Sequence, residues 1–333
     1  MKFLVVNSKE NYAGKLKILT EECAKKKLAL DLWDKDEKTG VVNYAKEAGY
    51  AAIIHRNEHG RLFADGSYSW VKESVTSGFP VISVDFGYLD HYKTFMFDYY
   101  RNPDLSSGIH DEWDKIPDKV EWKKTPRYIK NFRSEIFEKI AKADNSQYAG
   151  KVGVWMQWNA NLLRPELGGL KQWEWINRVC QKIVDVGFEP IVKMNLVDHS
   201  EIYKQTIPYV APWIKLICDK PKVAESNQRA WYDKNANWKM LAGCSYHIIM
   251  CSSVSHSMVL AQKPVIATGQ SWFNALNVFA EPVEWNSPFV KPSINHSARN
   301  KWINWWLSRQ CKFEDSAETL LRVFNLATKH FNK

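Results

Sequence analysis

The segment from residue 247 to 274 constrains the fold more than any other part of the chain. A short apolar run at 248–250 ends in a polar cluster at 251–255, and a second apolar run at 265–267 follows a stretch with helical spacing. This order of strand, hydroxyl-rich turn, helix and strand is typical of an open α/β sheet, in which ligands bind beyond the carboxyl ends of the strands. Backbone N–H groups and serine hydroxyls at a helix start suit a phosphate. The segment therefore predicts a nucleotide or phosphate site.

Apolar runs and helical stretches alternate along most of the chain. We expect strands at 3–6, 28–30, 51–54, 80–84, 151–156, 190–194 and 214–218, and helices at 12–27, 41–47, 69–77, 128–143, 172–186, 237–243, 298–309 and 316–329. Such alternation predicts parallel sheets. The pattern restarts after a polar stretch at 144–147, and a chain of 333 residues exceeds the usual size of one domain.

The predicted fold class is therefore α/β, with two similar halves. We place an N-terminal domain at 1–147 and a C-terminal domain at 148–300, and we expect helices at 301–333 to pack back toward the first domain. Residues 85–124 interrupt the alternation, because they are rich in aromatic residues, Asp, Pro and Gly and show little periodicity. A long irregular segment in a compact domain is usually functional or disordered, and the aromatic content argues against disorder.

Composition excludes several classes of protein. A hydrophobic fraction of 45% and a charged fraction of 25% are ordinary for a soluble protein. The six cysteines are scattered without a CxxC pair, which argues against a zinc site or a disulfide framework and favours reduced thiols in a cytoplasm. No run approaches the roughly 20 apolar residues of a membrane span, and the N-terminus does not read as a signal peptide.

Common catalytic motifs are missing. The chain has no G-x-G-x-x-G, Walker A, G-x-S-x-G or H-E-x-x-H motif, which argues against a dehydrogenase, a P-loop enzyme, an α/β-hydrolase or a zincin. His91 and His110 flank an Asp-containing loop, but histidines in a polar loop are more often free, and we expect no metal.

The net charge of +9 permits a polyanionic partner such as DNA or an anionic surface. Surplus lysine that only aids solubility explains the same charge. Sixteen tryptophans are a high count, and while many will lie in the core, some are candidates for stacking on sugars or bases.

Several short motifs occur in a recognisable order. They are V-W-M-Q-W-N at 154–159, P-I-V-K at 190–193, C-S-S-V-S at 251–255, A-Q-K-P-V-I at 261–266, G-Q-S-W-F-N at 269–274 and R-N-K-W-I-N-W at 299–305. In this order they resemble the sugar-donor domain of GT-B glycosyltransferases, in particular phage-encoded members and their relatives that transfer Kdo and capsule sugars. D-F-G-Y-L-D at 85–90 and D-L-S-S-G at 104–108 resemble the acceptor-side loop of the phage members.

The resemblance covers most of residues 80–312 and implies two Rossmann-like domains with a cleft between them. It implies a nucleotide-sugar co-substrate, most readily a UDP-sugar, with no other cofactor. Such a metal-independent enzyme needs N–H groups, hydroxyls and cations around the leaving diphosphate. The implied donor-binding residues are Gln157, Lys193, Ser252, Ser253, Ser255, Gly269 and Ser271. Ordinary helix capping is the alternative role of the serines.

The acceptor hydroxyl needs a general base, and the resemblance places it in the loop of the first half. Asp90 is the first candidate and Asp85, at a predicted strand end, the second. The alternative is that both aspartates cap turns. The candidate contacts to acceptor or DNA are Tyr88, Arg101, Lys124, Arg127, Lys130 and Arg133.

The function predicted from these residues is transfer of a sugar to a hydroxymethylated pyrimidine in double-stranded phage DNA. Two alternatives remain: transfer to a surface polysaccharide or lipid-linked glycan, and a nucleic-acid-binding GT-B module without catalysis. The second alternative draws on Ser257, which stands where the family often has a Glu that can hold the donor ribose. We expect a monomer in the cytoplasm (the host's, if phage-encoded) with no membrane partner.

Overall fold

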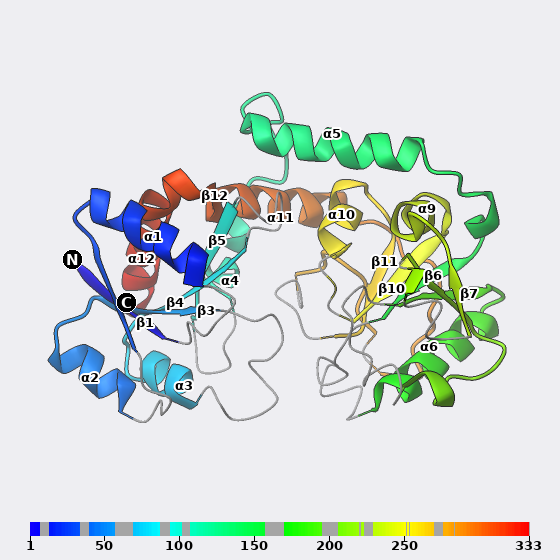
Figure 1. Ribbon diagram of the computed structural model, residues 1–333, viewed down its shortest axis with the longest axis horizontal. Helices are drawn as coiled ribbons and strands as arrows, with labels where there is room; N and C mark the ends of the chain where they lie inside the picture. The colour runs from blue at the N-terminus through cyan, green and yellow to red at the C-terminus, as the bar shows by residue number, and fades with distance from the viewer. Residues whose placement is uncertain are drawn as a thin grey trace. The chain divides into compact units, whose positions relative to one another are not determined.

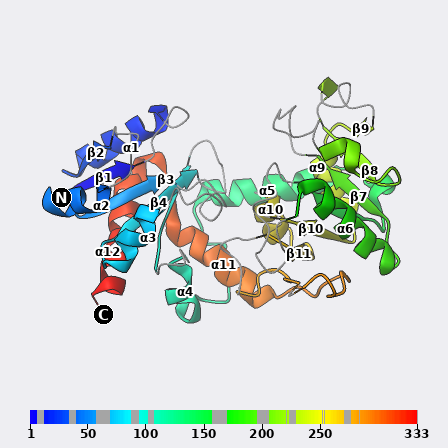
Figure 2. The same ribbon diagram turned by 90° about the horizontal axis from the view of Figure 1, so that it is seen from below.

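The chain forms two compact units, each with one six-stranded sheet. The computed structural model describes residues 1–6, 13–33, 40–56, 69–86, 94–101, 107–156, 170–194, 206–219, 221–222, 229–250, 252, 254–269, 276–282 and 284–332. Unit 1 consists of Met1–Ile129 and Asn300–Lys333, and unit 2 of Lys130–Arg299. Figure 1 and Figure 2 show the helices and strands of both units. The predicted α/β class with two similar halves is confirmed.

The sheet of unit 1 is mainly parallel, in the order β12-β5-β4-β3-β1-β2. Strands β1 to β4 are mutually parallel, whereas β5 runs antiparallel to β4 and β12 antiparallel to β5. The bounds are β1 (Lys2–Val6), β2 (Ala29–Leu32), β3 (Ala52–Arg56), β4 (Val81–Phe86), β5 (Thr94–Tyr99) and β12 (Gln310–Lys312).

Helices cover both faces of this sheet. One apolar core joins α1 and α12 to one face, and another joins α2 and α3 to the opposite face. Because both faces of the inner strands β1, β3 and β4 are covered, these strands need no polar alternation and are largely continuous apolar runs. The helices are α1 (Ala13–Lys25), α2 (Val41–Glu47), α3 (Ser69–Thr76), α4 (Ile109–Glu112) and α12 (Ser316–Phe331), with 3₁₀ turns at Trp113–Lys115 and Phe313–Asp315.

Strand β5 corrects the prediction that residues 85–124 are irregular. All six of its residues are buried, with Phe95, Phe97 and Tyr99 in the core that contains α1 and α12. A strand buried on both faces has no apolar-polar alternation, so its period of two was hidden from the sequence. The polar residue Asp98 also interrupts the apolar run, although its carboxylate is buried.

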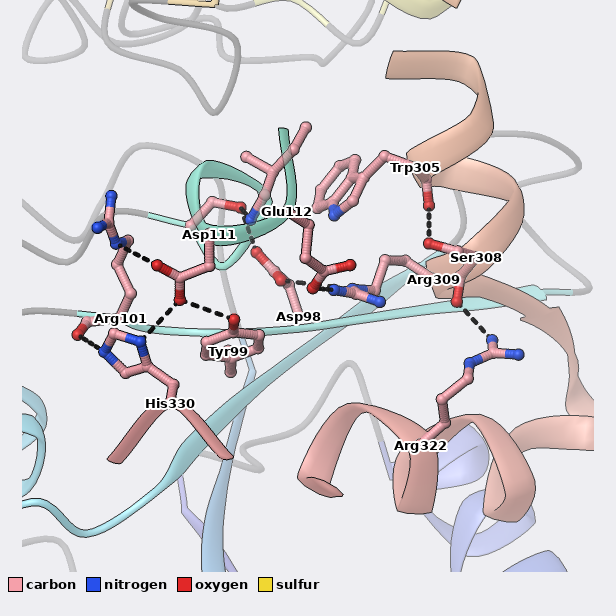
Figure 3. A network of polar contacts seen from close by, with 12 residues as sticks. Asp98, Tyr99, Arg101, Asp111, Glu112, Trp305, Ser308, Arg309, Arg322 and His330 are labelled. Atoms are coloured by element: carbon pink, nitrogen blue, oxygen red, sulfur yellow. Dashed lines mark hydrogen bonds and ion pairs between the residues drawn. The ribbon is translucent and has the colours of Figure 1, made fainter. Parts of the chain in front are cut away.

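A buried polar network surrounds Asp98 and ties the end of the chain into unit 1 (Figure 3). The Ser107 hydroxyl donates to Asp98 Oδ2, and Arg309 Nε lies 3.7 Å from Asp98 Oδ1. Arg309 also pairs through Nη2 with Glu112. Since Asp98 is 2% and Arg309 1% exposed, each charge depends on the other for compensation.

A second set of polar contacts lies beside the first in unit 1. Asp111 accepts a hydrogen bond from the Tyr99 hydroxyl at 2.9 Å and pairs with Arg101 Nε at 3.1 Å and with His330 Nδ1 at 2.8 Å. His330 belongs to α12, so the last helix is joined to the strand β5 and to the residues that follow it.

The sheet of unit 2 is entirely parallel, in the order β11-β10-β6-β7-β8-β9. Its strands are β6 (Val152–Trp155), β7 (Pro190–Lys193), β8 (Lys215–Cys218), β9 (Ala230–Tyr232), β10 (Tyr246–Ile249) and β11 (Val265–Ala267). The helices of this part of the chain are α5 (Arg127–Ala141), α6 (Gln172–Asp185), α9 (Ala236–Gly243), α10 (Val254–Leu260) and α11 (His296–Arg309), with 3₁₀ turns at Ser146–Tyr148 and Ile207–Tyr209.

Helix α6 forms because its apolar residues recur every three or four positions. Trp175, Ile176, Val179 and Ile183 are buried against the sheet of unit 2. The Glu174 carboxylate accepts the backbone N–H of Lys171 at 2.6 Å and so satisfies a donor at the helix start. Gly187, with φ of 83°, allows the left-handed turn that ends the helix.

The chain passes from unit 1 to unit 2 within α5, before the polar stretch at 144–147 after which the sequence pattern restarts. Gln147 and Tyr148 both donate to Asp233 Oδ2, so this stretch is packed into unit 2. Strands β9 and β12 were not predicted from the sequence, because each has three residues and neither is a run of aliphatic side chains.

We predict that Asp98→Asn changes how stability depends on pH. Burial raises the pKa of the Asp98 carboxyl from 3.8 to about 6, against the opposing effect of Arg309. A raised folded-state pKa gives stability that is complete below pH ~4 and is lost as pH rises through ~6. The unfolding free energy of the native protein minus that of Asp98→Asn should therefore fall between pH ~4 and ~6 and stay level above that range.

Urea unfolding at five pH values on both proteins measures this difference, and titrating groups that do not interact with Asp98 cancel in it. Asp114→Asn, an exposed aspartate of the adjacent 3₁₀ turn, is the control and should leave the pH profile unchanged. Parallel profiles for the native protein and Asp98→Asn would contradict the argument.

Candidate functional site

Polar residues gather where the parallel strands of unit 2 end. Lys193 is the last residue of β7, Asp219 follows β8, and Thr268 and Gly269 follow β11. Ser252 lies shortly after β10. Parallel strands all end at one edge of a sheet, and in open α/β sheets ligands bind outside that edge. We therefore take the carboxyl edge of this sheet as the candidate site.

Lys193 and Asp219 form a buried ion pair at this edge. Lys193 Nζ lies 3.2 Å from Asp219 Oδ1 and donates to the Met194 carbonyl at 2.9 Å. The side chains are 3% and 14% exposed, so the pair is largely removed from solvent. A buried charge pair contributes little net stability but fixes the position of both charges. The predicted donor residue Lys193 is thus held by a carboxylate that the sequence analysis did not identify.

Thr268 joins two strands and a helix at the same edge. Its hydroxyl accepts the Trp175 indole N–H at 3.0 Å and donates to the Ile249 carbonyl at 3.0 Å. The backbone N–H of Gly269 donates to the Met250 carbonyl at 3.0 Å. These bonds fix the ends of β10 and β11 against α6 and so give the edge a defined shape.

The serine cluster has a structural role in the described residues. The Ser252 hydroxyl accepts the backbone N–H of Val254 at 3.4 Å, and the Ser252 carbonyl accepts that of Ser255 at 2.9 Å. Ser252 thus helps to start α10, as the capping alternative expects. Ser255 is 1% exposed and Ser252 half-buried, so Ser252 is the one that solvent reaches.

His247, which opens the segment that constrained the fold, lies in the core. Its Nδ1 accepts the Trp155 indole N–H at 3.2 Å, and burial lowers the pKa of the imidazole to about 3. The imidazole ring packs directly against Gly153, since a Cβ at that position would lie 2.8 Å from His247 Nδ1. A residue with a side chain would leave no room for the ring. His247 therefore shapes the sheet and takes no part in the edge.

The first half of the chain contributes one described candidate base. Asp85 lies near the end of β4, opposite Met96 of β5, and is 6% exposed. Arg101, a predicted acceptor contact, is 33% exposed and ion-paired with Asp111. Both residues are in unit 1. Five further candidates lie outside the described residues: Tyr88, Asp90, Gln157, Ser253 and Ser271.

The basic residues predicted to contact DNA lie in and before α5. Lys124 is exposed but pairs with Glu121 at 2.6 Å, so part of its charge is balanced. The Arg133 guanidinium lies 4.7 Å from the centroid of the Phe137 ring. Arg127 is exposed, and Lys130 is half-buried one turn later on α5.

Sequence reasoning missed Asp219, Thr268 and Trp175. Asp219 and Thr268 each directly follow an apolar run, so their position after a predicted strand is the signal that could have found them. Trp175 carried no such signal, because an apolar residue at helical spacing reads as core.

The described residues contain no group of three or more His, Cys, Asp or Glu suited to a metal ion. Within the same parts of the chain, no helix is long and apolar enough to cross a membrane.

Sequence comparison finds no match to the chain, whereas structure comparison finds proteins of similar fold. No protein-family model and no curated protein match it. The chain is similar to a structure of Thermosulfurimonas dismutans KpsC, beta Kdo 2,7 transferase, with a TM-score of 0.52 and 9% identity over 97% of this chain and 99% of that one. It is also similar to the beta Kdo 2,4 transferase structure of KpsC from the same organism, with a TM-score of 0.48 and 8% identity over 89% of each chain.

A third similar structure is Methanocaldococcus jannaschii UDP-GlcNAc 2-epimerase, with a TM-score of 0.35 and 8% identity over 92% of this chain and 99% of that one. The likeness to the 2,7 transferase spans almost the whole of both chains. At 9% identity it shows the fold alone. The protein has the GT-B class of fold, with two Rossmann-like halves, and the predicted fold class is confirmed to this extent.

We predict that Thr268→Val destabilises unit 2. The Trp175 indole N–H would lose its acceptor inside the core, and an unsatisfied buried donor costs about 1–3 kcal/mol. Chemical unfolding should show this loss, together with a shift of tryptophan fluorescence in the native state. Thr328→Val is the control, because the Thr328 hydroxyl donates to the Phe324 carbonyl of its own helix at 2.9 Å and leaves a carbonyl, not a buried N–H, to be satisfied. Equal stability of the two variants would remove Thr268 from its assigned role.

Proposed function

We propose that this chain is a glycosyltransferase that moves a sugar from a nucleotide-sugar donor to a hydroxyl group of an acceptor. The observation that carries the proposal is the polar carboxyl edge of the sheet of unit 2, where Lys193 ends β7, Ser252 lies shortly after β10 and Gly269 follows β11. The likeness of the fold to that of a Kdo transferase supports it.

In this proposal the edge of unit 2 binds the donor. Glycosyl transfer builds negative charge on the leaving diphosphate, and fixed cations and N–H groups stabilise that charge. Lys193 is the cation, held in place by Asp219 and the Met194 carbonyl, and a diphosphate at the edge would share its ammonium with Asp219. Ser252 and the Gly269 turn supply polar groups beside it, and the motif order adds Gln157, Ser253, Ser255 and Ser271. A UDP-sugar is the donor we propose first.

The acceptor we propose first is a hydroxymethylated pyrimidine in double-stranded phage DNA. The net charge of +9 and the basic residues Arg127, Lys130 and Arg133 of α5 support a polyanionic partner. A hydroxymethyl group inside a duplex is poorly accessible, so the base would leave the stack for transfer. Tyr88, Arg101 and Lys124 are the further contacts in this proposal, with Asp90 as general base and Asp85 as second candidate.

A surface polysaccharide or lipid-linked glycan is the second candidate acceptor. The observation that favours it is the fold, which is similar to that of a transferase of Kdo, a sugar. The donor side of the proposal is the same for both acceptors.

One assay separates the candidates. The purified chain is incubated with hydroxymethylated duplex DNA, or with a glycan acceptor, and a panel of nucleotide sugars, and the products are weighed by mass spectrometry. We expect a gain of one sugar per modified base with one donor. A gain only on the glycan would assign the second acceptor. Tight DNA binding without a gain for any donor would leave a binding module and refute the transferase.

We predict that Asp90→Ala abolishes turnover while leaving donor binding intact. A positioned general base contributes about 10²- to 10⁴-fold to the rate, so kcat should fall by at least about 100-fold. Calorimetric titration with the donor should give an unchanged Kd, because the proposed donor residues lie in unit 2. Asp114→Ala, at an exposed aspartate of unit 1, is the control and should turn over normally. Near-normal turnover of Asp90→Ala would remove Asp90 as the base and direct the same test to Asp85.

A further inference from the structure

Large aromatic side chains stand exposed around the last two strands of the sheet in unit 2. Tyr209 is 60%, Trp213 51%, Trp231 41% and Tyr232 39% exposed. Trp231 and Tyr232 belong to the edge strand β9, and Tyr209 and Trp213 lie in the segment that leads into β8. We call these four residues the aromatic edge. Exposed large apolar groups in one place mark a binding surface rather than chance exposure.

The aromatic edge is held rigid by side chains that bond its backbone. Arg229, which directly precedes β9, donates to the carbonyls of Ile207, Val210 and Ala211 at 3.1, 2.5 and 2.9 Å. Asn177 of α6 donates to the Tyr209 carbonyl at 3.0 Å and accepts the Ala211 N–H at 2.9 Å. The Tyr209 ring also packs on that of Trp173, with centroids 5.6 Å apart. Rings fixed in this way lose little entropy when a ligand stacks on them.

The charges around the aromatic edge have one sign. Among the described residues between 206 and 239, every exposed charged side chain is a cation: Lys215, Lys222, Arg229 and Lys234. The two described acids of this stretch, Asp219 and Asp233, are ion-paired with lysines. Lys215 Nζ lies 4.4 Å from the centroid of the Trp231 ring. The exposed cations described in this stretch favour a ligand that is a polyanion.

We propose that the aromatic edge binds single-stranded nucleic acid. Proteins that bind single strands combine cations along the backbone with aromatic rings on which bases stack, and the aromatic edge supplies both. Binding of nucleic acid at the aromatic edge does not depend on the proposed glycosyl transfer.

The arrangement of the rings favours a single strand over an acidic polysaccharide. Successive residues of a strand point to opposite faces of a sheet, so Trp231 and Tyr232 present their rings on different sides of β9. A ligand that stacks on both rings needs planar groups that rotate independently of one another. Bases do so, because each rotates about its own glycosidic bond, whereas the sugar rings of a polysaccharide form the chain itself. A duplex keeps its bases stacked inside and cannot offer them.

Fluorescence anisotropy of a labelled 20-nucleotide oligo(dT) tests the proposal on the full chain. Contacts of three phosphates with Lys215, Lys222 and Lys234 predict a fall in affinity of about 20-fold between 50 and 200 mM salt. Trp213→Ala and Trp231→Ala should each weaken binding by about 5- to 150-fold, because each removes one stacking ring. Lys215→Ala should lessen the salt dependence.

Matched controls separate stacking from general effects. Tyr44→Ala removes a ring of unit 1 that is 45% exposed, and Lys72→Ala removes an exposed lysine of α3, and both should bind as the native protein does. Unfolding midpoints check that each variant is folded. The affinity for a duplex of the same length should be the same in the native and Trp231→Ala proteins, because a duplex does not stack on the rings.

Three results would overturn the proposal. The first is no binding of oligo(dT) at 50 mM salt, or equal binding by the native, Trp213→Ala and Trp231→Ala proteins. The second is binding of alginate, an acidic polysaccharide, that depends on these tryptophans while oligo(dT) does not bind. The third is a dimer that light scattering detects and Trp231→Ala abolishes, because the edge would then pair with a second copy. Mass gain in the transfer assay is a separate readout, so failure of one proposal does not imply failure of the other.

Discussion

Burial of both faces of each parallel sheet is the constraint on which the rest of the structure depends. In unit 2 the strands β6, β7 and β10 are buried along their whole length, so their side chains cannot be solvated. Polar residues are tolerated in these strands only at the strand ends, or where another buried group forms a hydrogen bond with them. Lys193 and Asp219 meet the first condition, and His247 with Trp155 meets the second. The candidate site is thus a consequence of how the core is built.

Unit 1 also contains polar residues in a buried part of its sheet. On the antiparallel strands these are charged side chains that pair with one another. Asp98 lies on β5 between two apolar faces, and its carboxylate is balanced by Arg309, which immediately precedes β12. Glu112 pairs with the same guanidinium, so three segments distant in sequence are joined. An apolar residue in place of Asp98 alone would leave Arg309 with a weaker set of partners, since each member of a buried network is satisfied by the others. The network therefore ties the C-terminal segment into unit 1.

A structural feature could be predicted from the sequence where the residues that reveal it lie close together in the chain. Helices such as α2 and α6 and the strands of apolar runs were predicted closely, because their periodicity is local. Strand β5 was not, because its burial on both faces removes alternation and Asp98 reads as a surface residue until Arg309, 211 positions later, is known to face it. Likewise Lys193 was named through the motif it belongs to, but its pairing with Asp219 depends on the order of β7 and β8 in the sheet, which no local pattern contains.

The residues of the aromatic edge differ from those that stability alone would favour. An exposed edge strand risks pairing with other chains, and nature commonly protects such strands with lysine. Lys215, at 4.4 Å from the Trp231 ring, fits that role. Protection alone, however, would favour small or polar residues on β9, and it gives no reason for Arg229 to bond three carbonyls of the neighbouring segment. Exposed rings on a clamped backbone, with only cations exposed around them in the described stretch, are better explained by a ligand that both stacks and carries negative charge.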